Sequence, residues 1–141
     1  MLILMHDERM SERIERTAER CVWDLCDHFG LTVPKFGIHW DLVGPDELGT
    51  ATGDHLIRLH PTYCEALGCA YEQTVMHEAA HIVTARRSMQ RYANRSADWS
   101  PHGKEWRRAM RLLGAEVVPH ATTTEMALAA SIDWNQRAAM V

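Results

Sequence analysis

Apolar residues recur at steps of three and four between residues 7 and 29, which predicts a long amphipathic helix. Charged residues, mostly Glu and Arg, cover the other sides of this segment. Gly30 is a natural end for the helix, and Pro34 prevents its continuation. The apolar positions of the helix are Met10, Ile14, Ala18, Cys21, Val22, Leu25, Cys26 and Phe29.

The next stretch changes to an alternation of apolar and more polar residues, which is typical of a half-buried strand. Phe36, Ile38 and Trp40 belong to this pattern, and a Gly-Pro-Asp turn follows it. Together with two later segments it predicts a small, mainly antiparallel, three-stranded meander. The expected strands are residues 36–43, 48–52 and 55–60.

Helical patterns return after Pro61. Gly68 and Gly114 are natural helix ends, and the stretch from 89 to 101 is polar enough to be a loop. Thr122 and Glu125 have the spacing of a capping box, so a further helix is expected behind them. The expected helices are residues 62–67, 70–88, 103–113 and 126–140.

These elements predict an α+β fold in a chain of 141 residues, a length typical of one domain. We expect the core within residues 7–120 and a helical tail at 121–141. The hydrophobic fraction of 46% and the charged fraction of 24% indicate a globular rather than a disordered chain. A chain of this length can bury a core without disulfides.

No run of the sequence approaches the ~20 apolar residues of a membrane span, and the apolar residues 1–5 are too short for a signal peptide. We therefore expect a soluble cytoplasmic protein with no membrane partner. In that compartment cysteines stay reduced, and their C-x₄-C spacings are not those of a zinc ribbon. We expect packing roles for Cys21 and Cys26, which fall on or near the apolar side of a helix. A further role for any of the four cysteines, which include Cys64 and Cys69, stays open.

The expected helix 70–88 contains an H-E-x-x-H motif at residues 77–81. His77 and His81 are four positions apart, so they project from the same helix face. Two neutral imidazoles placed in this way can bind one Zn²⁺ ion. Glu78 can then lie beside the metal and act as a general base. The filler residues are small or apolar, as a buried helix requires.

A hydrolytic zinc site normally has three protein ligands, so the chain must supply one more. The longer motif H-E-x-x-H-x-x-G-x-x-H is absent. It would need Gly at position 84 and His at position 87, and these positions hold Thr84 and Arg87. His102 is the favoured ligand, since it begins the next helix and Gly103 lets the backbone approach the metal. We expect Trp106 to pack beneath the site. Glu105 is the alternative ligand.

The motif at 77–81, the segment Ser100–Trp106 and the later Met110 and Leu113-Gly114 resemble the SprT-like zinc metallopeptidase family. The resemblance covers roughly residues 10–120 and implies a zincin-like α+β fold. It implies one zinc ion on His77, His81 and His102, with Glu78 catalytic. Family members include proteases that clear proteins crosslinked to DNA, and many carry a C-terminal zinc ribbon. Residues 122–141 contain no cysteine for such a ribbon.

Charge is distributed unevenly along the chain. The net charge of −4 argues against a general nucleic-acid binder. Residues 86–111, however, hold eight basic residues against two acidic ones, a net charge of +6. Within this segment one helix face could contact DNA phosphates or be an ordinary solvated surface. The residues of this face, here called the basic stripe, are Lys104, Arg107, Arg108 and Arg111.

The sequence therefore predicts a zinc-dependent endopeptidase, with DNA-associated proteins as one substrate class. Glu78 would take a proton from the attacking water and deliver it to the leaving amine. His120 and Tyr92 are candidate donors to the oxyanion. Two alternatives remain open: a non-catalytic module that binds DNA or protein and keeps zinc for structure, and a regulatory protease with one partner protein and no DNA role.

Overall fold

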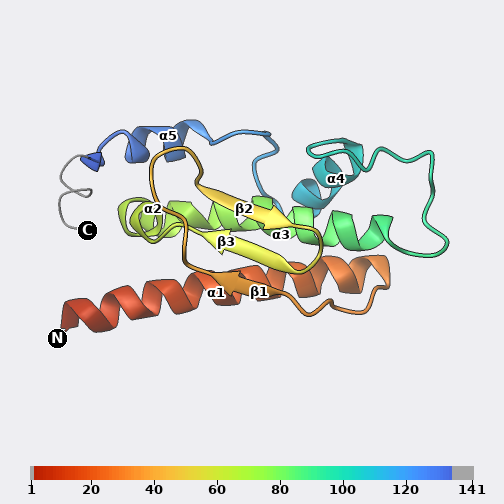
Figure 1. Cartoon of the computed structure of the whole chain (residues 1–141), viewed down its shortest axis with the longest axis horizontal. Coiled ribbons are helices and arrows are strands. Elements are labelled where there is room, and N and C mark those ends of the chain that lie inside the picture. The colour runs from red at the N-terminus through yellow and green to blue at the C-terminus, as the bar shows by residue number, and fades with distance from the viewer. Residues whose placement is uncertain (1, 135–141) are drawn as a thin grey trace.

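The computed structural model describes residues 2–134. Its secondary structure follows the predicted order, with a long first helix, a small sheet and four later helices (Figure 1). The elements are α1 (Leu2–Phe29), β1 (Gly37–His39), β2 (Gly49–Thr52), β3 (Leu56–Leu59), α2 (Pro61–Leu67), the 3₁₀ turn η1 (Gly68–Ala70), α3 (Tyr71–Ser88), α4 (Lys104–Leu112) and α5 (Thr123–Ala129).

The sheet is mixed, and its strand order is β1-β3-β2. The pairing of β2 with β3 is antiparallel, as expected, but β1 pairs with β3 in parallel, so the expected meander is wrong. β3 takes the central place because it carries the buried residues Ile57 and Leu59. The irregular segment after β1 lets the chain pass β3, where Leu42 N donates to Leu59 O at 3.1 Å.

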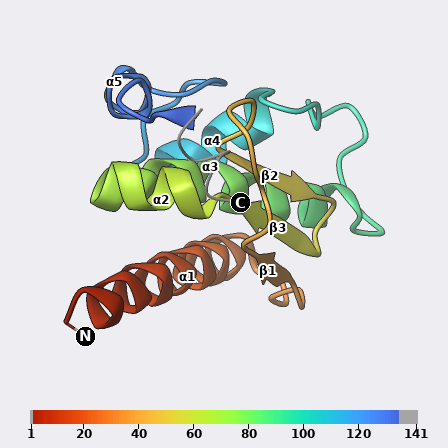
Figure 2. The same ribbon diagram turned by 60° about the vertical axis from the view of Figure 1, so that its left-hand side comes forward.

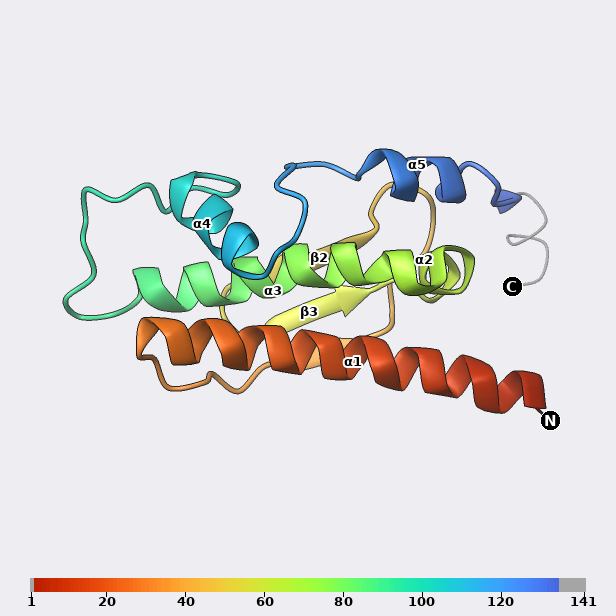
Figure 3. The same ribbon diagram turned by 180° about the vertical axis from the view of Figure 1, so that it is seen from behind.

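Two helices, α1 and α3, run side by side (Figures 1 and 3). Their contact faces are fully buried; Ala18 and Val22 from α1 and Ala79 and Val83 from α3 belong to one core cluster. Small side chains allow the two helices to approach closely. α4 and α5 lie on the opposite side of α3 from α1 (Figures 1 and 2). This leaves one face of α3 between α4 and the sheet.

The C-terminal region confirms the capping box but not the length of the helix behind it. Thr122 Oγ1 accepts from Glu125 N, and the Glu125 carboxylate accepts from Thr122 N. α5 ends at Ala129, so the expected helix 126–140 is correct for residues 126–129 and wrong for residues 130–133, and residues 135–140 lie outside the described residues. After the helix the chain continues in a tighter turn, in which Ile132 N donates to Ala129 O.

Three of the four cysteines are buried, and all four are free thiols. Burial raises the pKa of Cys21 and of Cys64 to about 11, so both are packing residues and poor nucleophiles at neutral pH. Cys69 is exposed. Between residues 2 and 134 no helix is long and apolar enough to cross a membrane.

Candidate metal centre

Three histidine side chains converge on one face of α3. His77 and His81 come from α3, one turn apart, and His102 comes from the loop before α4. The Nε2 atoms are 3.2 Å apart for His77 and His81, and each is 3.1 Å from Nε2 of His102. In the part of the chain that the structure describes, this is the group of side chains that could hold a metal ion. It is here called the histidine triad.

The spacing of the three nitrogen atoms fits a shared metal. A tetrahedral ion with nitrogen ligands at about 2.0–2.1 Å separates those ligands by about 3.3–3.4 Å. The observed separations of 3.1–3.2 Å are slightly shorter. Burial and the neighbouring imidazoles lower the pKa of His77 to about 3 and that of His81 to about 4. Both rings are therefore neutral near pH 7, as metal ligands must be.

Trp106 forms the floor beneath the histidine triad, as the sequence predicted. It is fully buried, and its ring centroid is 4.7 to 5.5 Å from those of the three imidazoles. The indole Nε1 donates to His77 O at 3.2 Å. Trp106 therefore fixes α4 against α3 at the level of the metal centre.

Glu78 is the carboxyl group nearest to the triad in sequence, and it is only 6% exposed. Burial raises its pKa to about 8, and the carboxylates of Glu47 and Glu125 add to this shift. A carboxyl group with a pKa near neutrality can both accept and donate a proton at physiological pH. It is this property that a general base and acid needs.

The triad and Glu78 line a large open cavity. Its volume is about 750 Å³, and it extends between the edge strand β2 and the segment Pro119–Ala130. A second cavity of about 350 Å³ lies towards the loop before α4, and Glu78, His81 and His102 line it as well. The side chains that line both cavities are Glu78, His81 and His102. An extended ligand therefore has room on both sides of the candidate metal centre.

Comparisons with known proteins place the chain in a family. The model of the SprT-like family matches residues 5–127. The chain belongs to the SprT-like family. It is 31% identical over 103 residues to Protein SprT of Pseudomonas paraeruginosa (strain DSM 24068 / PA7), a match that covers 72% of this chain and 58% of that relative. The chain therefore corresponds to less than two thirds of that relative's length. No solved structure matches it.

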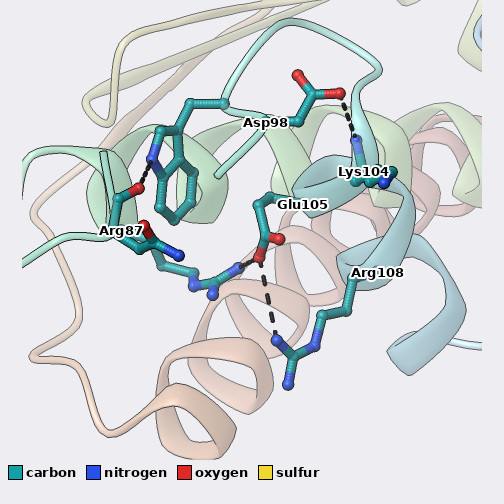
Figure 4. Close-up of polar contacts among 7 residues, drawn as sticks. Arg87, Asp98, Lys104, Glu105 and Arg108 are labelled. Atoms are coloured by element: carbon teal, nitrogen blue, oxygen red, sulfur yellow. Dashed lines mark hydrogen bonds and ion pairs between the residues drawn. The ribbon is translucent and has the colours of Figure 1, made fainter. Parts of the chain in front are cut away.

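The alternative ligand of this SprT-like chain, Glu105, lies apart from the triad. Its carboxylate pairs with Arg87 at 2.7 Å and with Arg108 at 4.0 Å (Figure 4). Arg87 also lies over the ring of Phe29, 3.8 Å from its centroid, and near that of Trp99. Glu105 is therefore a structural residue that joins α4 to α3, and the described metal group contains only histidines.

Of the two candidate oxyanion donors, only His120 lines the large cavity. Its Nδ1 lies 2.9 Å from Ala121 O. Tyr92 is 87% exposed and lines a different cavity, beside Arg91. Tyr92 therefore lies outside the lining of the cavity that contains the histidine triad.

The basic stripe lies on the exposed side of α4, as the amphipathic pattern predicted. Two of its members have contacts within the chain: Arg107 Nε donates to His102 O at 3.0 Å, and Arg108 approaches Glu105. One residue of the basic stripe, Arg107, therefore also helps to hold the turn that carries the third histidine.

Sequence reasoning missed the residues that attach the wall of the large cavity to α3. Thr74 donates its hydroxyl to Glu125, and both side chains are buried. One residue earlier, the Gln73 amide donates to Glu116 O at 2.7 Å and accepts from Glu116 N at 3.1 Å. The capping-box spacing identified Glu125 but carried no signal for a partner 51 positions away.

Proposed function

We propose that this SprT-like protein is a zinc-dependent endopeptidase with His77, His81 and His102 as ligands of one Zn²⁺ and Glu78 as general base. The observation that carries the proposal is the convergence of three imidazole Nε2 atoms beside a buried carboxyl group in an open cavity. A bound zinc ion would supply Lewis acidity, which activates water and polarises a carbonyl group.

The chain's own residues would carry the proton transfers. Glu78 takes a proton from the water that attacks the scissile carbonyl and delivers it to the leaving amine. Its burial keeps the carboxyl group away from bulk water, which supports proton exchange near neutral pH. His120, at the cavity, is the remaining candidate for a donor to the oxyanion.

The edge strand supports an extended polypeptide as the substrate. β2 lies at the edge of the sheet, and Gly49 and Thr50 line the large cavity while Ala51 lines the smaller one. The unpaired backbone groups of an edge strand can pair with an added peptide strand. A peptide bound in this way would pass the triad and Glu78.

An open metal site favours catalysis over the non-catalytic alternative. A structural zinc site is usually closed by a fourth protein ligand. Among the described residues the candidate metal ligands are three histidines. The carboxylate of Glu105, the alternative ligand, is held in an ion pair with Arg87. The fourth position therefore remains for water or substrate.

Metal analysis tests the ligand set. We expect His102→Ala to lower the zinc content of the purified protein sharply, and Glu105→Ala, the matched control on the same helix, to leave it unchanged. The opposite pattern would move the site to one glutamate and two histidines.

The substrate class is a second part of the proposal: proteins bound to DNA. The net charge of +6 in residues 86–111 and the exposed basic stripe support a phosphate contact. The test is cleavage of a DNA-binding protein with and without single-stranded DNA. We expect DNA to increase cleavage, and the Lys104→Ala/Arg111→Ala variant to lose salt-dependent DNA binding while it retains zinc. Equal cleavage without DNA would favour a protease with a single partner protein.

A further inference from the structure

The turn that carries His102 is held by a carboxylate four positions earlier. Asp98 Oδ1 accepts from Ser100 N at 3.2 Å and from the Ser100 hydroxyl. Asp98 Oδ2 accepts from Lys104 N at 3.1 Å (Figure 4). Ser100 precedes His102 in the sequence, and Lys104 follows it. One side chain therefore joins the residues before and after the third histidine.

His102 needs this support because its backbone is in the left-handed region. Its φ is +61°, and it is the non-glycine residue with positive φ in the described chain. Such a conformation is unfavourable for a residue with a Cβ atom and persists only where the surroundings impose it. Gly103 N donates to Ser100 O at 2.9 Å, which closes the turn around His102. The ring reaches the triad from this turn.

Gly103 makes room for the carboxylate. A Cβ atom added at this position would lie 2.6 Å from Cγ of Asp98, far closer than a normal contact. The backbone of Gly103 itself, with φ −76° and ψ −171°, is one that alanine can adopt. The group that Gly103 admits is thus the side chain of Asp98.

We propose that Asp98 is a positioning residue for the third ligand of the metal centre: its carboxylate holds the turn that directs the imidazole of His102 into the triad. This inference rests on the proposed metal role of His102. It does not depend on proteolysis, because the effect is on metal affinity.

Zinc affinity is the direct readout. We expect Asp98→Ala to weaken Zn²⁺ binding at least tenfold in competition with a chromophoric chelator, an effect typical of the loss of supporting contacts. Asp98→Asn keeps one accepting oxygen and should lose less zinc affinity. It replaces the alanine variant in this measurement if the alanine variant folds poorly. Asp41→Ala is the matched control, because Asp41 is exposed and pairs with Arg58 at 2.9 Å on the sheet.

Two double variants separate positioning from a general loss of structure. In the background His102→Ala, the further change Asp98→Ala should leave the residual zinc affinity unchanged, since Asp98 acts through His102. Gly103→Ala alone should weaken zinc binding, because its new Cβ displaces the carboxylate. When Asp98→Ala is already present, Gly103→Ala should cause little further loss.

The inference is overturned if Asp98→Ala binds zinc as tightly as Asp41→Ala, or if Asp98→Ala still weakens binding in the His102→Ala background. These outcomes are distinct from failure of the proposed function. A protein that binds zinc through His102 but cleaves no substrate would refute the endopeptidase, and the Asp98 measurements would still decide the inference.

Discussion

Replacement of Trp106 tests the packing beneath the metal centre. The side chain is fully buried, and burial of a tryptophan removes about 150–250 Å² from water. At about 25 cal/mol per Å², this corresponds to ~4–6 kcal/mol. Truncations of buried aromatic residues typically cost about 3–5 kcal/mol. We therefore expect Trp106→Ala to lower the free energy of unfolding by about 3–5 kcal/mol.

Trp106→Phe is the sharper variant, because it keeps an aromatic ring but removes the indole N–H that donates to His77 O. The lost hydrogen bond costs about 0.5–1.5 kcal/mol, and the smaller ring leaves a cavity, for a total of about 1–3 kcal/mol. Trp23 is 56% exposed, so Trp23→Phe is the matched control and should change stability by at most about 0.5 kcal/mol.

The assay is urea unfolding followed by circular dichroism in the presence of EDTA, so that zinc does not contribute to stability. Zinc affinity is measured on the same samples and should fall in the order wild type, Trp106→Phe, Trp106→Ala. If Trp106→Phe and Trp23→Phe lose the same free energy of unfolding, the reasoning about the floor of the triad is wrong.

Three further changes test other parts of the fold. Thr74→Val removes the hydroxyl that Glu125 accepts, so it should cost about 1.5–3 kcal/mol and speed amide hydrogen exchange in α5; unchanged exchange would contradict the attachment of the cavity wall. Burial lowers the pKa of His60 below 6.5, so its stabilising contribution is present above pH 6.5 and is lost as the pH falls through 6.5 towards the lower folded-state value. Between pH 7 and about pH 5, in EDTA, the free energy of unfolding of His60→Asn should therefore fall less than that of the wild type. The two slopes should differ by up to ~1.4 kcal/mol per pH unit, and equal slopes would refute this. Gly68→Ala should cost about 1–3 kcal/mol in urea unfolding, because φ 56° with ψ −129° is strained for alanine; a neutral result would contradict the turn.

The elements that the sequence predicted correctly depend on local patterns. The histidines of α3 share a face because four residues make about one helical turn, and this needs no tertiary information. The amphipathic pattern of α4 placed Trp106 in the core and the basic stripe outside it. The place of His102 at the start of the next helix favours it as the third ligand, the SprT-like resemblance also implies it, and the structure brings it to the other two histidines.

The features that escaped prediction depend on contacts between distant segments. Alternation identifies a strand but not its partner, so the parallel pairing of β1 with β3 could not be read from it. The left-handed backbone of His102 has no signature in residue type, since glycine would be the expected residue there. The partnership of Thr74 with Glu125 needs the whole fold to bring α5 to α3.

The most direct test of the central proposal is a paired measurement on Glu78→Gln. The variant keeps the size of the side chain but cannot accept and return a proton. Zinc content and cleavage of casein are measured on the same preparation, beside the wild type. We expect the wild type to bind one zinc ion and cleave, and the variant to keep the zinc and lose cleavage. A variant that cleaves at the wild-type rate would contradict the role of Glu78, and a wild type that binds zinc but cleaves neither casein nor a DNA-bound protein would contradict the endopeptidase.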